Sequence, residues 1–225
     1  GGLADYIAEF ITQFSYIPYL GEALLAVVFV IFQKAIALSI DRDEWYVLSF
    51  VAPVMMLVYM SDIYVMLSYL VALIAAVLLC ALYRRHPGII GAGIATVLGY
   101  WLIGPAIFVF TLFAVIRERN CKSLILIALS VIVVVASRLT YLQQYPWKTV
   151  IFGINYYRLP ITVPAMQLII AGVTALIPAF SDLLPKPRRI LDISLGLLIL
   201  AGGTVGCWMN YEKDVVELIA YDQMV

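Results

Sequence analysis

The stretch "HPGIIGAGIATVLGYWLIGPAIFVFTLFAVIRERNCK", residues 86–122, decides the fold, because its path sets the side of a membrane on which everything after it lies. Its apolar part, 89–116, is longer than the roughly 20 residues that span the hydrocarbon of a bilayer. Basic residues flank it at both ends. The segment therefore either crosses a membrane once or enters it and returns.

The composition of the 225-residue chain indicates a membrane protein. Hydrophobic residues make up 64% of it and charged residues 12%, whereas soluble domains are about 45–50% apolar and about 25% charged. The formal net charge is zero, which gives no reason to expect a nucleic acid as partner. The expected partner is the lipid bilayer. Apolar runs that predict helices lie at about 18–40, 45–60, 64–83, 89–116, 122–138, 161–180 and 191–209.

The distribution of Lys and Arg distinguishes the two paths, because short cytoplasmic loops are enriched in these residues. A single crossing divides the 14 basic residues eight against six. Entry and return divide them ten against four, which is the usual asymmetry. The ten are Lys34, Arg42, Arg84, Arg85, Arg117, Arg119, Lys122, Lys186, Arg188 and Arg189, and the four are Arg138, Lys148, Arg158 and Lys213.

The sequence also offers a place to turn, at Gly104-Pro105. Each arm of 89–116 is then about 15 residues, or roughly 22 Å of helix. Such a pair must be buried against other helices or line a cavity, so we expect it to be central. The alternative is one long tilted helix, kinked at Pro105.

These patterns predict an all-α, polytopic integral membrane protein with six full transmembrane helices and a re-entrant or short-helix pair at 89–116. Residues 1–16 are expected to form an external interfacial helix, 17–210 a transmembrane domain, and 211–225 the start of an external helical segment. Both ends then lie on the non-cytoplasmic side. Because the chain begins and stops inside helical patterns, we expect it to be part of something longer.

The first segment, "GGLADYIAEFITQF", has the pattern of an amphipathic helix that lies along a membrane surface. Asp5, Glu9 and Thr12 lie opposite its apolar side. The apolar stripe consists of Leu3, Tyr6, Ile7, Phe10, Ile11 and Phe14.

The external loop 138–160 mixes basic and aromatic residues. Arg138, Lys148 and Arg158 are candidates for holding a lipid diphosphate, and Trp147 or Tyr157 for stacking on a sugar. The alternative is an anchoring belt at the membrane surface. Arg138 closes an apolar span and is expected to need an anionic partner such as Asp62, Asp5 or a lipid phosphate.

Three phrases carry a family resemblance: "GGLADYIAEFITQF", "YWLIGPAIFVFTLFAVIRER" and "YEKDVVELIAYDQM". They resemble an uncharacterised group of Bacteroidota inner-membrane proteins in which a multi-span half is followed by a periplasmic helical region. This resemblance implies a bacterial inner (cytoplasmic) membrane location with both termini periplasmic.

The layout, with an external amphipathic helix early in the chain, is also similar to that of membrane glycosyltransferases that use polyprenyl-phosphate sugars. That likeness implies an acidic residue in the first external loop as base or metal ligand, and Asp5 or Glu9 holds the matching place. The alternative is that both acids form the solvated face of an interfacial helix. Neither a cofactor nor a bound metal is identified.

Two other functional classes stay open. A non-catalytic scaffold or assembly subunit would display a periplasmic domain and join other membrane subunits. A secondary transporter would use the broken helices at membrane depth, although the spans carry no ionisable residue near their centres. In the last span, Gly202 and Gly206 lie four residues apart, which predicts a face that meets another helix.

Overall fold

A computed structural model of the chain describes residues 2–40, 42–61, 65–118, 123–153, 165–185 and 189–222; for 189 and 212–222 only the backbone is described. The described part is helical and contains no strand, so the all-α prediction is confirmed. Seven of its segments are long and apolar enough to cross a membrane. How many of them cross from side to side stays a prediction.

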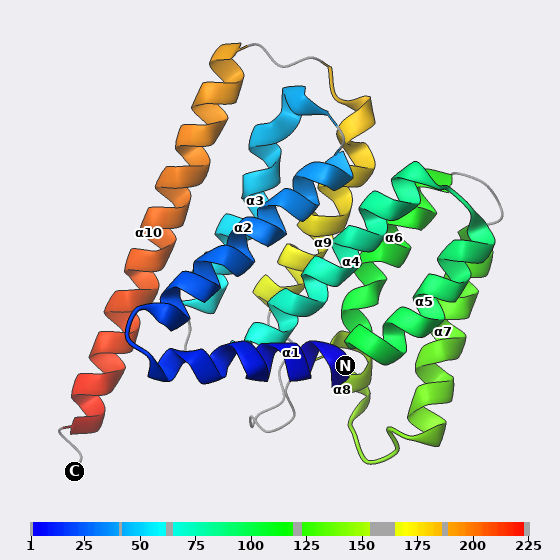
Figure 1. Ribbon diagram of the computed structural model, residues 1–225, viewed down its shortest axis with the longest axis horizontal. Coiled ribbons are helices and arrows are strands. Elements are labelled where there is room, and N and C mark those ends of the chain that lie inside the picture. The colour runs from blue at the N-terminus through cyan, green and yellow to red at the C-terminus, as the bar shows by residue number, and fades with distance from the viewer. Residues whose placement is uncertain are drawn as a thin grey trace.

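Figure 1 shows the helices gathered into a bundle, with α1 lying across one end of it. In chain order the elements are α1 (Gly2–Thr12), the 3₁₀ helix η1 (Gln13–Tyr16), α2 (Leu20–Ile40), η2 (Asp43–Phe50), α3 (Val51–Met60), α4 (Leu67–Arg85), α5 (Ile89–Ile103), η3 (Gly104–Ala106), α6 (Ile107–Glu118), α7 (Ser123–Thr140), α8 (Trp147–Phe152), α9 (Ala165–Phe180), η4 (Ser181–Leu183) and α10 (Arg189–Asp222).

Helices α5 and α6 form an antiparallel hairpin. The hydroxyl oxygens of Thr96 and Thr111 lie 3.3 Å apart, whereas 15 residues of continuous helix would separate them by roughly 22 Å. Gly104 makes the turn with a φ of 69°, a conformation that costs other residues energy, and Pro105 follows it. The return of the chain within 89–116 is confirmed, and a single kinked helix is excluded.

The two arms of the hairpin differ in burial. Helix α6 packs against α4, α5, α7 and α9 and buries Ile107, Phe110 and Phe113. Helix α5 contacts chiefly α6, α7, α1 and α4, and Ile90, Ile94 and Trp101 on its outer side are exposed. The expectation of a central pair is therefore correct for α6 and wrong for α5, because α5 presents large apolar side chains outward.

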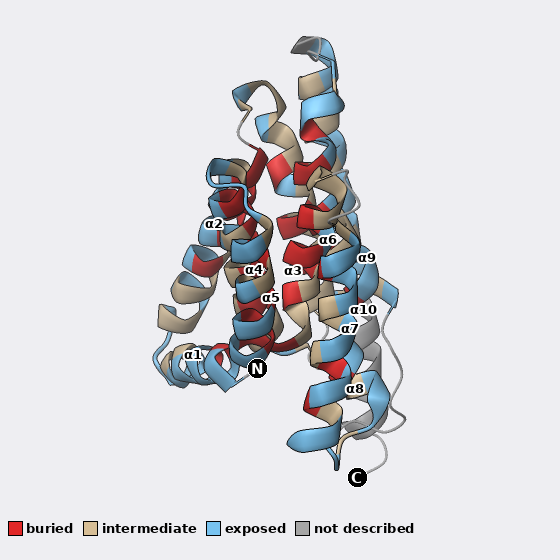
Figure 2. Cartoon of the chain, turned by 90° about the vertical axis from the view of Figure 1, so that its right-hand side faces the viewer, coloured by how far each residue is buried: buried red, intermediate tan, exposed pale blue. Residues whose placement is uncertain are grey.

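Buried residues concentrate where α2, α4, α6 and α9 face one another, and exposed positions cover the outside of α7 (Figure 2). Helices α7 and α10 are the least buried of the candidate spans. Their exposed residues are mostly large and apolar. Such an exterior would be costly in water but is natural against lipid.

The hairpin gives the bundle two chemically different ends. We call the end that carries Arg42, Arg84 and Arg117, where α2, α4, α6 and α9 finish, the arginine end. We call the opposite end, with α1 and α8, the α1 end. The described chain starts and finishes toward the α1 end (Figure 1). This layout matches the predicted order of the helices, whereas the side of a membrane that each end faces stays a prediction.

The apolar run at 45–60 contains Pro53 and takes the form of η2 followed by α3. Pro53 is the third residue of α3, where the missing N–H costs nothing, but its ring disfavours α-helical geometry four residues earlier. The preceding segment accordingly adopts an eight-residue 3₁₀ helix with non-helical backbone angles at Trp45. The kink at Trp45 divides this segment into two short pieces, in line with the usual short length of 3₁₀ helices.

Helix α1 is held by small residues on its inner side. Ala4 and Ala8 are buried, which allows α1 to approach α4 and α5 closely. Leu3, Tyr6, Ile7 and Phe10 of the predicted stripe are exposed, whereas Ile11 is partly buried against the core. An apolar face without protein cover is what an interfacial helix requires. Contact with a membrane itself stays a prediction.

The predicted packing face of α10 is half correct. A β-carbon at Gly202 would meet nothing within 4 Å, whereas one at Gly203 would lie 2.6 Å from Val54 and one at Gly206 would lie 2.8 Å from Val58. Helix α10 therefore packs on α3 through Gly203 and Gly206. Gly202 faces away, because the contact surface is rotated by one residue from the predicted face. The helix continues unbroken beyond Tyr211, and the domain boundary there stays a prediction.

Candidate functional site

The hairpin decides which candidate residues share an end of the bundle. Since α5 and α6 return the chain to the arginine end, α7 runs back toward the α1 end and delivers the following loop there (Figure 1). Asp5 and Glu9 of α1 and Arg138 and Lys148 of the α7–α8 region consequently lie toward the same end. With a single crossing at 89–116 they would lie at opposite ends.

The two acids of α1 are exposed and one helical turn apart. At a spacing of four residues their side chains project to the same side of the helix. They border the alanine face that packs on the bundle. Near them, the Thr12 hydroxyl donates a hydrogen bond to the carbonyl of Glu9 over 2.8 Å, which completes the last turn.

Arg138 is held by its own loop. Its Nη1 donates to the carbonyl of Gln143, and the guanidinium carbon lies 5.6 Å from the centre of the Trp147 ring, within the range of a cation–π contact. The Nε of Arg138 is buried and has no hydrogen-bond partner. The expected anionic partner is thus replaced, among the described residues, by a carbonyl and an aromatic ring. Asp62 lies outside the described residues.

The remaining predicted binding residues divide into described and undescribed ones. Trp147 is about half exposed at the start of α8, and one of its ring faces is taken by Arg138. Lys148 follows it and is exposed. Arg158 and Tyr157 lie outside the described residues. The structure therefore brings together Arg138 and Trp147, with Lys148 beside them in the sequence.

Helix α8 was missed by the sequence reasoning, which treated 138–160 as one loop. The helix follows Pro146, ends at Phe152 and is capped by Gly153, whose φ of 67° is left-handed. Pro before a helix and Gly after it are terminal signals that would have found it. The segment is too short for hydropathy alone to reveal.

Helix α8 covers the tip of the hairpin. The Tyr100 hydroxyl of α5 donates to the carbonyl of Val150 over 2.8 Å, and Gln167 Nε2 of α9 donates to the carbonyl of Phe152 over 2.8 Å. A β-carbon at Gly153 would lie 3.5 Å from Pro105. These contacts fix α8, and with it Trp147, against the half-helices.

The candidate residues of α1 and of the external loop could act together if the two segments faced each other across one cavity, but no such cavity is among the hollows described. Helix α1 packs mainly on α4 and α5, whereas α8 packs on η3 and α7. Two hollows can be described, and residues of η2 line both. Neither is lined by α1 or by α8. That α1 and the external loop face each other across one cavity remains a prediction.

A second polar cluster, not predicted, occupies the arginine end. Asp182 in η4 accepts from Arg84 through Oδ1 and from Arg117 through Oδ2, the latter over 2.8 Å. The Arg84 side chain is only 7% exposed. Its Nη1 also donates to the carbonyl of Ser39 over 2.8 Å and to Ser181 Oγ over 3.2 Å. The cluster ties the ends of α2, α4, α6 and α9 together.

Arg42 closes the same end on the side of α9. Its Nη1 donates to the carbonyls of Ser181 and Leu184 over 2.8 and 2.9 Å, and its Nη2 pairs with Glu44 over 3.2 Å. Carbonyls at a helix terminus lack a full set of partners within the helix, so Arg42 satisfies carbonyls of η4 and of Leu184, which follow α9. Arg42, Arg84 and Arg117 are thus occupied by protein groups.

Within the described residues, no three His, Cys, Asp or Glu side chains are grouped as a metal site would need. Cys80 is buried and Cys207 half-buried, and both are free thiols. Cys121 lies outside the described residues. That the protein holds no metal ion with its own side chains remains a prediction.

The whole chain, residues 1–225, matches the model of a family described as a family of unknown function (DUF6057). The chain belongs to this family. No curated protein and no solved structure matches it. This DUF6057 chain therefore has helices long and apolar enough to cross a membrane, and it matches the family over its whole length. The description of the family states no activity.

Proposed function

We propose that this DUF6057 chain is a multi-pass membrane protein that binds a lipid-linked, phosphate-bearing donor at the α1 end and transfers a glycosyl group from it. One observation carries the proposal. The α5–α6 hairpin, marked by the 3.3 Å approach of Thr96 and Thr111, lets the acids of α1 and the cations of the α7–α8 region share one end. An enzyme acting at a membrane surface needs both types of group there.

The proposed chemistry assigns separate roles to the two segments. The bond between the anomeric carbon of the sugar and the lipid phosphate breaks, and a new bond forms to an acceptor hydroxyl. Asp5 or Glu9 takes the proton of that hydroxyl as general base. Arg138 and Lys148, with Arg158, stabilise the negative charge that develops on the departing lipid phosphate, and Trp147 or Tyr157 stacks on the sugar.

The geometry of Arg138 supports its role as the phosphate ligand. Its guanidinium is oriented by the Trp147 ring and by the carbonyl of Gln143, and its Nε has no partner. A buried N–H without a partner is costly. A lipid phosphate oxygen would satisfy it, and an Arg held in one orientation can bind phosphate through two donors.

The test uses Asp5→Asn and Arg138→Gln, made singly in the intact protein, with the envelope glycan and the protein level both measured. Loss of an essential acid or base lowers the rate by about 10²–10⁴, so both variants should lose the glycan at normal abundance. Glu22→Gln and Arg85→Gln, which change exposed charged residues that have no role in the proposal, are the matched controls. A normal glycan in both site variants at normal abundance would contradict the proposal.

A non-catalytic scaffold is the second candidate, and α10 favours it. Only 6% of its apolar window is buried, and among the described helices it packs chiefly on α3 and η2. The remaining surface is available to another membrane subunit. If it is a scaffold, Asp5→Asn and Arg138→Gln will be silent, whereas bulky polar residues on the outer face of α10 will break an assembly.

A further inference from the structure

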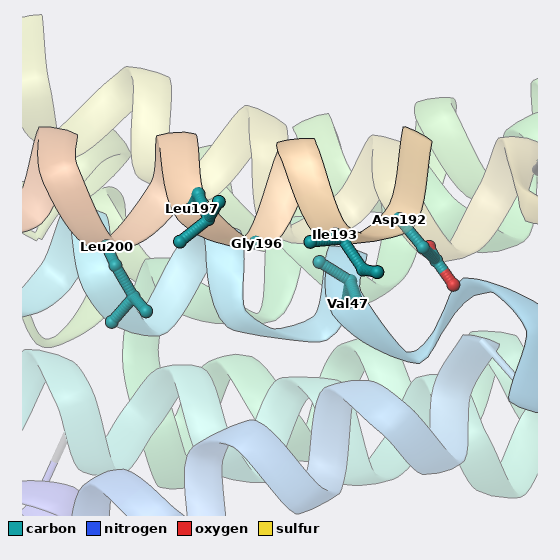
Figure 3. Close-up of a pocket in the computed structure, with 6 residues that line it drawn as sticks. All are labelled: Val47, Asp192, Ile193, Gly196, Leu197 and Leu200. Carbon is teal, nitrogen blue, oxygen red and sulfur yellow. The ribbon is translucent and has the colours of Figure 1, made fainter. Parts of the chain in front are cut away.

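A hollow of about 460 Å³ lies between the first half of α10 and η2, away from the proposed site. Asp192, Ile193, Gly196, Leu197 and Leu200 line it from α10, and Val47 faces them from η2 (Figure 3). From Asp192 to Leu200 it follows the helix for roughly 12 Å. All its lining residues except Asp192 are apolar. We call this hollow the α10 groove.

Asp192 gives the α10 groove one polar end. It lies in the first turn of α10, at the edge of the apolar window that begins at Ile190. Its Oδ1 is buried and has no hydrogen-bond partner. A carboxylate in that position is costly unless a cation or an N–H donor satisfies it. A ligand of the groove therefore needs a donor at one end and an apolar body.

Gly196 opens the apolar part of the groove. A β-carbon at Gly196 would lie 3.8 Å from Val47, in ordinary contact, so the hydrogen atom of glycine leaves room for something else to lie along α10. Ile193, Leu197 and Leu200 are exposed beside it. In a bilayer such a surface is covered by hydrocarbon, and the helix direction would align an acyl chain with it.

We propose that the α10 groove binds a phospholipid whose head group carries a primary ammonium, such as phosphatidylethanolamine. The ammonium donates N–H hydrogen bonds to the Asp192 carboxylate, and one acyl chain lies along Gly196 toward Leu200. The two ends of the lipid thereby match the two ends of the groove. A choline head group carries the same charge but has no N–H to donate, and an anionic head group is repelled by the carboxylate.

The bound lipid would stabilise the attachment of α10. This helix is held by η2 near the groove and by α3 farther along, where Gly203 and Gly206 approach Val54 and Val58. A ligand that fills the groove binds the packed state and not the detached one, so it shifts the equilibrium toward packing. The site differs from the α1 end in position, charge and ligand, and it does not depend on the proposed glycosyl transfer.

The test is lipid retention by the purified full chain. The protein is equilibrated in nanodiscs with equal parts of phosphatidylethanolamine, phosphatidylcholine and phosphatidylglycerol of identical acyl chains, and the lipids that stay bound after transfer to detergent are counted by native mass spectrometry. Wild-type protein should retain the ethanolamine lipid over the choline lipid by roughly ten-fold, the scale of a charge-assisted hydrogen bond. In Asp192→Asn that ratio should fall close to one, and Asp192→Glu should restore part of it.

Two further variants locate the site. Asp43→Asn removes an exposed acid that lines the other hollow, together with Lys34 and Tyr46, and should leave the ratio unchanged. Gly196→Leu fills the groove and should reduce retention of the ethanolamine lipid more than that of the other two, because that lipid occupies the groove in preference to them. An equal ratio in the wild-type protein, an unchanged ratio in Asp192→Asn, or loss of the preference in Asp43→Asn would overturn the proposal.

Discussion

Thr96 and Thr111 lie across the α5–α6 hairpin with their hydroxyl oxygens 3.3 Å apart, and each hydroxyl can donate its one hydrogen to the carbonyl four residues earlier in its own helix. Both hydroxyls are therefore satisfied within the buried hairpin, where an unpaired polar group would be costly. This contact, far from either end of the bundle, determines the end at which the α7–α8 region emerges.

The closest approach within the hairpin predicts a position-specific effect of alanine. A β-carbon at Gly99 would lie 2.4 Å from Cδ1 of Ile107, which is fully buried, so Gly99→Ala should destabilise the protein by about 1–3 kcal/mol. Gly91→Ala is the matched control, because nothing lies within 4 Å of its β-carbon and helix propensity favours alanine. Thermal unfolding in detergent measures both, and equal melting temperatures would contradict the observed packing.

The shared carboxylate of Asp182 predicts a second effect. Asp182→Asn leaves Arg84, whose side chain is 7% exposed, without its charged partner, although Arg84 keeps its carbonyl contacts. We expect a loss of about 1–3 kcal/mol of stability, less than for a fully buried pair because the Asp182 side chain is 43% exposed. Arg85→Gln, at an exposed neighbour, should have no measurable effect. Thermal unfolding in detergent measures this loss of stability. Wild-type stability in Asp182→Asn would mean that the contacts of Asp182 contribute no more than an exposed surface ion pair does.

Packing of α10 on α3 predicts an asymmetry between neighbouring glycines. Gly203→Leu and Gly206→Leu must displace Val54 and Val58, whereas Gly202→Leu adds a side chain in open space. The first two should loosen α10 and make it a target for limited proteolysis, and the third should not. A protease-resistant α10 in all three variants would mean that the contact does not hold this helix.

The cover over the hairpin tip predicts a small, specific loss. Tyr100→Phe removes the donor to the Val150 carbonyl and should cost about 0.5–1.5 kcal/mol. Tyr16→Phe, at a side chain that is 94% exposed, is the control with the same chemical change. Thermal unfolding measures the difference between the two variants, and its absence would show that α8 is not anchored through this bond.

Much of the fold follows from properties that are summed over long stretches of the sequence. Hydropathy over 20-residue windows locates the spans, and the asymmetry of Lys and Arg favours the return at Gly104-Pro105, because both properties sum over many residues. The rotation of α10 is different, because Gly202, Gly203 and Gly206 lie within five residues of sequence and only the position of α3 selects the pair that packs.

The polar clusters are harder to predict for the same reason. Arg84, Arg117 and Asp182 lie on three different elements, and nothing local indicates that they meet. Arg138 shows the limit in another way, since the sequence suggested an anionic partner but the loop supplies a carbonyl and the Trp147 ring. Close packing of α1 through Ala4 and Ala8 was likewise hidden by the more conspicuous apolar stripe beside them.

The proposed site requires that α1 and the α7–α8 loop face the same side of a membrane, and single-cysteine labelling measures this directly. In a protein whose Cys80, Cys121 and Cys207 are replaced by alanine, exposed positions are changed one at a time by Gln13→Cys, Gln143→Cys and Arg85→Cys, and intact cells are treated with a membrane-impermeant maleimide. We expect labelling of the Gln13→Cys and Gln143→Cys variants from outside, and of the Arg85→Cys variant only after permeabilisation. Labelling that groups Gln143→Cys with Arg85→Cys, and apart from Gln13→Cys, would show a single crossing at 89–116 and contradict both the topology and the proposed site.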